Sequence, residues 1–282
     1  MNSPNRTYLK KTKINYIFAP KNIFKFILGS LVLTHAIISH AQQARQFNIS
    51  YDASLSIDAN KSANTGLSKN IISALSSALG GSIVVGGVND TISFSKDAYH
   101  IKSVGSLGSI LSVLTDKNTF TRISDGQVIN GSTSTLRYVD SRAGSAPLTT
   151  LVDSRSQKII IYDGKKVTAK TDYRGTIQDL LCFGYGFIGK LPSGVVSVNI
   201  ADGKSIKQAI FDIRKETIKS SQGAVDTVKL TRRLSAKDDA SVEYWLRNSD
   251  GIPLRIRIGM SQRYGATLIL SAVKPPEKVT PL

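Results

Sequence analysis

The chain of 282 residues carries 37 lysine and arginine residues against 20 acidic residues, which gives a formal net charge of +17. A single cysteine excludes an internal disulfide, so stability must come from a hydrophobic core, for which this length is ample. The high positive charge would suit a nucleic-acid partner, but its distribution argues against one.

The first 41 residues have the pattern of a secretory signal peptide. They contain six basic residues and no acid, and residues 27–38 then form an apolar run that ends at Ser39-His40-Ala41. A basic segment, a short apolar run and small residues at the end predict cleavage after Ala41. The run is short for a membrane span, which needs about 20 residues, and an uncleaved anchor is the alternative.

The expected product, residues 42–282, is a soluble periplasmic protein. Ala41-Gln42-Gln43 offers no cysteine for a lipid, so we do not expect a lipoprotein or a stable membrane span after cleavage. Removing the six basic residues from +17 leaves +11, scattered without a block of like charges. Outside the cytoplasm we expect no nucleic-acid partner. Anionic lipid headgroups or polysaccharide phosphates would suit a basic face, and a merely solubilising surface is the alternative.

The first predicted elements after the signal are a strand and a helix. Residues 47–57 alternate apolar and polar side chains, as a half-buried strand does. In residues 65–79, apolar side chains recur at helical spacing before Gly80-Gly81. This short amphipathic helix would either cap an open end of a sheet or act as a mobile flap.

Strand patterns resume at residue 82. We predict strands at 82–86, 90–95 and 98–104, then a loop or helical turn, and further strands at 119–124, 127–129, 134–139 and 158–162. Asp125-Gly126 lies between two alternating runs. It therefore predicts a hairpin, because both central residues of a type I′ turn need positive φ. Asp163-Gly164 predicts a second turn.

One apolar stretch, residues 176–188, predicts a helix that ends before Pro192. Asp179 near its start suits the helix dipole. Cys182 lies inside this stretch, which favours a buried small hydrophobic side chain over a nucleophile.

The last third reads as a run of strands at 195–200, 205–216, 224–234, 241–247, 252–260 and 266–273. In the hairpin over 240–260, period two separates apolar side chains such as Val242 and Tyr244 from Trp245, Arg255 and Arg257. Trp245 would stack with a guanidinium. The two arginines would hold an anionic headgroup if their face lines a cavity, or else are outward solubilising charges.

Short, closely connected strands predict a mainly β fold and one β-rich domain over residues 42–273. The sheet would be antiparallel and form a sandwich, a barrel or a curled sheet. Residues 274–282 are rich in proline and polar residues and are predicted to be a flexible tail.

Several motifs, in order, resemble an exported proteobacterial domain of unknown function, family 3108. They are Tyr51-Asp52, the segment 99–103, the loop from Gly105, the segment 177–181, and the Trp-Leu, turn, Pro-Leu-Arg pattern within 244–257. The resemblance implies a large antiparallel sheet curled round a helix, a half-barrel or open barrel like the carriers that escort lipoproteins between bacterial membranes. One or two helices would cover it. The family implies no known catalytic residue.

The residues offer little for catalysis or metal binding. His100 is the only histidine after residue 41 and lies in a strand pattern, and no Gly-x-Ser-x-Gly occurs. One cysteine and one histidine cannot form a typical zinc site, so we expect no metal and no cofactor. A pair of carboxylates brought together from distant strands stays open.

We therefore expect a non-enzymatic envelope protein that binds or carries an amphipathic ligand, such as a lipid, an acyl chain or a lipidated protein. The cover of its cavity would come from apolar helix residues and its mouth from the cationic hairpin: Leu67, Ile71, Leu75, Phe183, Phe187, Trp245, Arg255 and Arg257. The alternatives are a structural or assembly factor with a filled interior that acts through protein contacts, and an enzyme such as a hydrolase. The oligomeric state is not predicted.

Overall fold

A computed structural model describes residues 45–57, 82–108, 119–221, 223–235, 240–260, 266–277 and 279. All of them belong to one compact unit of the chain, residues 41–282. The predicted signal peptide and the predicted helix over 65–79 lie outside the described residues. The described part of the chain contains no helix that is both long and apolar enough to cross a membrane.

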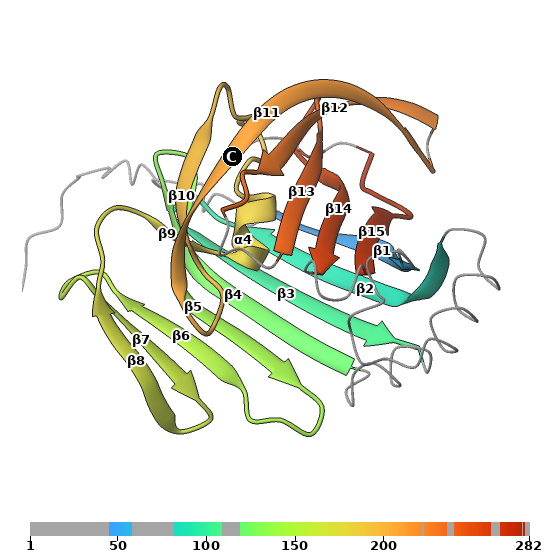
Figure 1. Ribbon diagram of the computed structural model, residues 1–282. Helices are drawn as coiled ribbons and strands as arrows, with labels where there is room; N and C mark the ends of the chain where they lie inside the picture. The colour runs from blue at the N-terminus through green and yellow to red at the C-terminus, as the bar shows by residue number, and fades with distance from the viewer. Residues whose placement is uncertain are drawn as a thin grey trace, which may run out of the picture. The chain divides into compact units, whose positions relative to one another are not determined.

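The described residues form one sheet of 15 strands that curls without closing (Figure 1). The first eight strands are β1 (Arg45–Ile57), β2 (Ile83–Phe94), β3 (Ala98–Leu107), β4 (Thr119–Ile129), β5 (Ser132–Arg142), β6 (Leu148–Asp153), β7 (Lys158–Asp163) and β8 (Lys166–Asp172). The other seven are β9 (Ile177–Asp179), β10 (Val196–Ala201), β11 (Ile206–Ser220), β12 (Gly223–Arg232), β13 (Ala240–Arg247), β14 (Pro253–Met260) and β15 (Ala266–Ala272). The predicted mainly β fold with a large curled sheet is confirmed.

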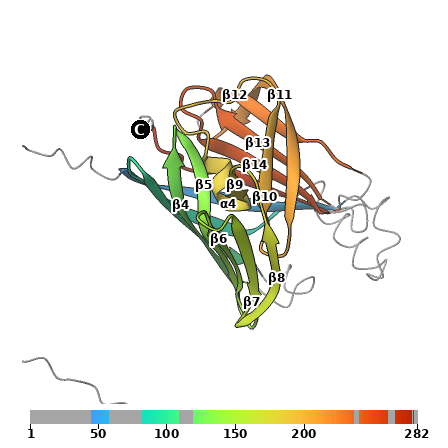
Figure 2. The same cartoon turned by 90° about the vertical axis from the view of Figure 1, so that its left-hand side faces the viewer.

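The first strand joins the two halves of the sheet. Strand β1 pairs antiparallel with β2 on one side and with the last strand, β15, on the other, so that Tyr51 lies opposite both Val88 and Ala272. From this seam, β2 to β8 extend in one direction and β15 down to β9 in the other. Every pair is antiparallel except the short parallel pair of β9 and β10. The two halves curve toward each other around the helix α4, Leu180–Tyr185 (Figure 2).

Strict alternation decides which side chains face inward. On β3, Tyr99, Ile101 and Ser103 are buried, whereas His100 and Lys102 are exposed. Successive side chains of a strand point to opposite faces of a sheet, so each strand contributes one row to the concave interior. This pattern is what the sequence analysis used, and it explains why most of the strands were predicted. The two strands predicted at 82–86 and 90–95 form the single strand β2.

The hairpin predicted at Asp125-Gly126 is wrong. Strand β4 continues through these residues with a register shift between them, and the chain turns at Asn130-Gly131, where φ is 53° and 75°. Gly126 serves a close approach instead, because a Cβ there would lie 2.2 Å from the carbonyl oxygen of Ser134. The predicted turn at Asp163-Gly164 is confirmed, with Gly164 at φ 59° between β7 and β8.

The predicted helix over 176–188 is much shorter than expected. Residues 177–179 form strand β9, and α4 spans only Leu180–Tyr185. Its apolar character reflects burial on several sides of the helix. Cys182, Phe183, Gly184 and Tyr185 are all buried, and two glycines at 184 and 186 disfavour a longer helix. The sequence analysis also did not assign strands β6 and β8. Both are short, and β8 is exposed along almost its whole length.

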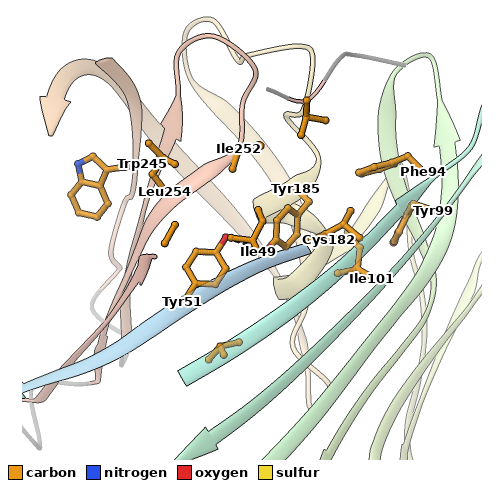
Figure 3. Packing of buried hydrophobic residues seen from close by; sticks show 14 of the residues in the cluster. Ile49, Tyr51, Phe94, Tyr99, Ile101, Cys182, Tyr185, Trp245, Ile252 and Leu254 are labelled. Atoms are coloured by element: carbon orange, nitrogen blue, oxygen red, sulfur yellow. Dashed lines mark hydrogen bonds between the residues drawn. The ribbon is translucent and has the colours of Figure 1, made fainter. Parts of the chain in front are cut away.

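The largest apolar cluster packs between α4 and strands of both sheet halves (Figure 3). It contains Ile49 and Tyr51 of β1, Ile101 of β3, Cys182 and Tyr185 of α4, and Leu254 of β14. The helix therefore fills the concave side at the seam.

Part of the segment predicted as a flexible tail packs against the turn between β13 and β14. Arg247 and Asp250 form a buried ion pair there, with Arg247 Nη2 2.6 Å from Asp250 Oδ2. The same guanidinium donates to the carbonyl oxygen of Pro276, and the N–H of Val279 donates to Asp250. The charged pair thus ties residues 276 and 279 to the sheet.

Candidate functional site

A cavity of about 350 Å³ lies between α4 and the inner faces of both sheet halves. This volume is at the lower end of the range for small-molecule sites, roughly 300–1,000 Å³. Strands β2 to β4 contribute one wall, α4 contributes a second, and strands β10 to β15 contribute the third. A ligand there would contact parts of the chain far apart in sequence.

Most of the cavity lining is apolar. On β13 and β14 the inward rows predicted by alternation, Val242 with Tyr244 and Ile256 with Ile258, form one continuous surface. The lining continues over Phe120, Leu180, Leu181, Ile200, Ala209, Phe211 and Leu270. This surface would accept a hydrocarbon chain.

A polar row crosses one wall of the cavity. Asp90 on β2 lies opposite Ser103 on β3, Ser103 lies opposite Arg122 on β4, and Arg122 lies opposite Asp140 on β5. The first three line the cavity. Because the register places them directly side by side, adjacent members are about 5 Å apart along the sheet. The cavity is therefore amphipathic, with one polar wall facing an apolar one.

Asp90 is the most buried member of this row, with 4 % of its surface exposed. Its Oδ2 accepts a hydrogen bond from the hydroxyl of Tyr185, whose oxygen lies 3.1 Å from that of Tyr51 (Figure 3). Its Oδ1 is buried and has no hydrogen-bond partner among the described residues. Burial raises the pKa of Asp90, against the lowering effect of Ser103, Tyr185 and the charge of Arg122.

Arg122 holds its guanidinium between an aromatic ring and a carboxylate. Its Cζ lies 4.6 Å from the centre of the Phe120 ring, and its Nε lies 3.6 Å from Asp140 Oδ2. That Nε is buried and makes no hydrogen bond within the described part of the chain. Asp140 accepts two hydrogen bonds from Arg142 instead, at 3.0 and 3.3 Å. The ring and the carboxylate thus hold the Arg122 guanidinium in place. Asp140 does not accept a hydrogen bond from the Arg122 Nε.

The opposite wall adds more positive than negative charge. Lys207 on β11 and Arg232 on β12 line the cavity together with Asp202. Asp202 accepts hydrogen bonds from the N–H groups of Lys204 and Ser205 at 2.8 and 2.7 Å, which commits its carboxylate to the loop between β10 and β11. The described lining therefore favours an anionic group over a cationic one.

A buried polar network positions α4 against the sheet. Asp179 caps the helix: its Oδ1 accepts from the N–H groups of Leu181 and Cys182, and its Oδ2 accepts from the hydroxyls of Ser124 and Thr135. Burial raises the pKa of Asp179, and these four hydrogen bonds oppose the rise. The network connects the helix to β4 and β5, so it fixes the wall that α4 contributes to the cavity.

Cys182 belongs to this network. It is fully buried, as predicted, and its Sγ lies 3.3 Å from the hydroxyl of Thr135. Burial first, and then the nearby charge of Asp179, raise the pKa of the thiol to about 12. The sulfur is therefore a protonated thiol at neutral pH, a poor nucleophile that serves packing.

The structure places the predicted cationic residues elsewhere. Trp245 does stack with cations as predicted, with Arg255 Cζ 5.7 Å and Lys229 Nζ 4.5 Å from its ring centre. However, Trp245, Arg255 and Arg257 line a shallow groove on the outer face of the sheet. Their strand neighbours line the cavity on the inner face, so they do not lie at its mouth. Arg257 pairs there with Glu243 at 2.9 Å.

The two predicted phenylalanines of the cover pack away from the cavity. The ring of Phe183 stacks on Phe211 at 4.5 Å and meets Phe187 edge-on at 5.2 Å. Neither Phe183 nor Phe187 contributes to the cavity lining, which α4 supplies through Leu180, Leu181, Gly184 and Tyr185. The other predicted cover residues, Leu67, Ile71 and Leu75, lie outside the described residues.

Sequence reasoning missed Asp90, Ser103, Arg122 and Arg232. A signal was present, because Asp90 and Arg122 each occupy an inward position of an alternating strand, two residues from Val88 and Phe120. A charged residue in an apolar row marks a site or a buried pair. Only the register between strands shows that these residues form one row.

The comparisons with known proteins give a family and no activity. No curated protein shows significant similarity to the chain. The model of one family, described as "Protein of unknown function (DUF3108)", matches residues 78–271. That match includes the cavity wall from β2 to β4, helix α4 and strands β10 to β14. Since it covers more than half of the sequence, the chain belongs to the family of proteins of unknown function DUF3108.

Proposed function

We propose that this protein is a non-enzymatic binding protein that takes the apolar part of an amphipathic molecule, such as a lipid, an acyl chain or a lipidated protein, into its inner cavity. The observation that carries the proposal is the amphipathic lining, in which an apolar wall from β13 and β14 faces a polar row on β2 to β4. Apolar pockets with a few convergent polar groups are typical of small-molecule sites.

The size of the cavity limits the ligand. If each non-hydrogen atom takes about 30 Å³, as in liquid water, a cavity of about 350 Å³ holds about a dozen such atoms. That corresponds to a single chain of medium length, or to part of a longer one. Burying ten methylenes would contribute about 8 kcal/mol, and association costs about 4–15 kcal/mol. Apolar burial alone therefore gives weak binding, and contacts to the polar wall must add to it.

The first 41 residues support a proposal for the cellular location of the protein. Their basic segment, apolar run and small residues support export by a signal peptide, and we propose that the mature chain acts as a soluble periplasmic protein of the cell envelope. Such a compartment offers lipids and lipidated proteins as partners. The excess of positive charge that remains after residue 41 would favour anionic ones.

A displacement assay with a fluorescent apolar probe tests the proposal. In the purified full chain, 1-decanol should displace the probe in a saturable manner. Ala209→Phe adds a ring on the inward face of β11 and should abolish saturable binding by filling the cavity. The matched control is Gln208→Phe, which adds the same ring to the neighbouring exposed position and should bind like the unchanged protein.

Two results would oppose the proposal. One is the absence of saturable probe binding together with the absence of any copurifying amphiphile in native mass spectra of protein isolated from the envelope. The other is equal binding by Ala209→Phe and the unchanged protein, which would place the probe elsewhere. Either result would favour the alternative, an assembly factor that acts through protein contacts.

A further inference from the structure

Resting on the proposed function, we infer that the ligand is a single-chain amphiphile with an anionic headgroup, bound at the row formed by Asp90, Ser103 and Arg122. The chain would lie on the apolar wall of β13 and β14. The headgroup chemistry is a carboxylate or a phosphate monoester, which share the negative charge and the acceptor oxygens that this row would recognise.

Two buried polar atoms of the row lack a hydrogen-bond partner within the described chain, Oδ1 of Asp90 and Nε of Arg122. Buried polar atoms are nearly always hydrogen-bonded, so such a pair in one cavity wall requires an explanation. Asp90 and Arg122 lie two strands apart, about 10 Å between backbones, with Ser103 between them. One headgroup placed over Ser103 would reach both side chains.

Burial favours the neutral form of the Asp90 carboxyl group over its charged form. Asp90 is almost completely buried, and burial raises its pKa. The charged or titratable groups that face it are Arg122 from β4, Tyr185 from α4 and Tyr51 from β1. Tyr185 donates to Oδ2, so a proton on Oδ1 points to the side that has no partner. When it is protonated, Asp90 would donate a hydrogen bond from Oδ1 to an anionic headgroup.

The charges around the row favour an anion over a cation. The described lining carries three basic side chains, Arg122, Lys207 and Arg232, against two acidic ones. Burial disfavours the charged form of Asp90, and the carboxylate of Asp202 accepts hydrogen bonds from its own loop. Asp140 lies at the end of the row, and Arg142 offsets its charge. The planar guanidinium of Arg122, held on the Phe120 ring, matches the two oxygens of a carboxylate or phosphate.

The test compares four ligands with the same ten-carbon chain in the probe-displacement assay: decanoate, decyl phosphate, 1-decanol and decylammonium. One charge-assisted contact corresponds to about a 10-fold gain in affinity. We therefore expect decanoate, decyl phosphate or both to bind about 10-fold tighter than 1-decanol, and decylammonium to bind more weakly than 1-decanol. The tighter of the two anions identifies the headgroup.

Arg122→Gln should remove this preference, lowering the affinity for the anion about 10-fold while leaving that for 1-decanol within twofold. Arg137→Gln is the matched control, because this exposed arginine pairs with Asp125 outside the cavity lining and its replacement should leave the preference unchanged. Circular dichroism and thermal unfolding check that both variants fold. The four-ligand comparison in the unchanged protein needs no variant and stands if Arg122→Gln does not fold.

Failure of this inference is distinct from failure of the proposed function. If 1-decanol binds and fills the cavity but neither anion binds more tightly, the inference is overturned and the proposed function stands. An anion preference that survives in folded Arg122→Gln also overturns it. If no ten-carbon ligand displaces the probe, the proposed function itself fails.

Discussion

Asp90 shows how one residue can serve function at a cost in stability. Its side chain is buried in the cavity wall, and one of its oxygens has no partner among the described residues. Because the pKa of Asp90 is higher in the folded state than in the unfolded state, its protonated form stabilises the fold. This contribution is fully present at pH values below the unfolded pKa of about 4. That contribution is lost as the pH rises through the folded pKa. The fold should therefore become more stable at neutral pH when this acid is replaced by a neutral side chain.

The corresponding variant is Asp90→Asn. Relative to the unchanged protein, its free energy of unfolding should increase by about 1 kcal/mol between pH 4 and pH 7, because the amide cannot ionise. Urea unfolding of both proteins at the two pH values measures this difference, and groups that titrate equally in both cancel. A difference between the two proteins that stays constant with pH would show that Asp90 is ionised without penalty.

Other single residues act through position alone. Asp179, Ser124 and Thr135 hold α4 in place through hydrogen bonds, and Cys182 packs among them as a protonated thiol. The sequence analysis identified Asp179 as suited to the helix start and Cys182 as a packing residue. The partners of Asp179 on β4 and β5 were not predictable, since they depend on how the helix meets the sheet.

At the scale of elements, the turn after α4 and the turn between β13 and β14 lock together. Gly189 donates its N–H to the carbonyl oxygen of Asp250, 2.9 Å away. Gly251, at φ 80°, lies against the backbone of Phe187 in the turn after α4, because a Cβ at Gly251 would lie 2.1 Å from the carbonyl oxygen of Phe187. Glycine is thus needed at 251 both for its φ and for close backbone contact.

Gly251→Ala tests this contact. We expect the free energy of unfolding to fall by at least about 3 kcal/mol, since the new methyl group meets backbone in addition to the positive φ. Gly131→Ala is the matched control, with φ 75° and no atom within 4 Å of an added Cβ, and should cost about 1 kcal/mol. Urea unfolding compares them, and equal losses would mean that the two turns do not pack as described.

The elements also show what sequence reasoning can and cannot reach. Alternation identified the inward rows of β13 and β14 and the stacking of Trp245 with a cation, because both follow from period two within a single hairpin. The turn was misplaced at Asp125-Gly126, since the same dipeptide chemistry suits a bulge and a turn. The polar row was missed because Asp90, Ser103 and Arg122 come from three strands, and one residue of register would send each to the other face.

At the scale of the whole molecule, the same sheet contributes side chains to the apolar core and to the walls of the cavity. Strand β1 pairs with β15 and so joins the two halves of the sheet, which curve toward each other. Helix α4 packs on the concave side between them. The family resemblance already implied a curled sheet around a helix. The position of the remaining cavity could not be derived, because it depends on which side chains of α4 reach each wall.

The most direct test of the central claim, that an alkyl chain occupies this cavity, uses methyl groups as reporters. In the full chain with ¹³C-labelled isoleucine methyls, intermolecular nuclear Overhauser effects from the chain of 1-decanol should reach Ile200, Ile256 and Ile258, which line the cavity. They should not reach Ile159 or Ile161, which are buried in a separate cluster. Effects confined to those two control residues, or absent from all five at saturating 1-decanol, would contradict the account.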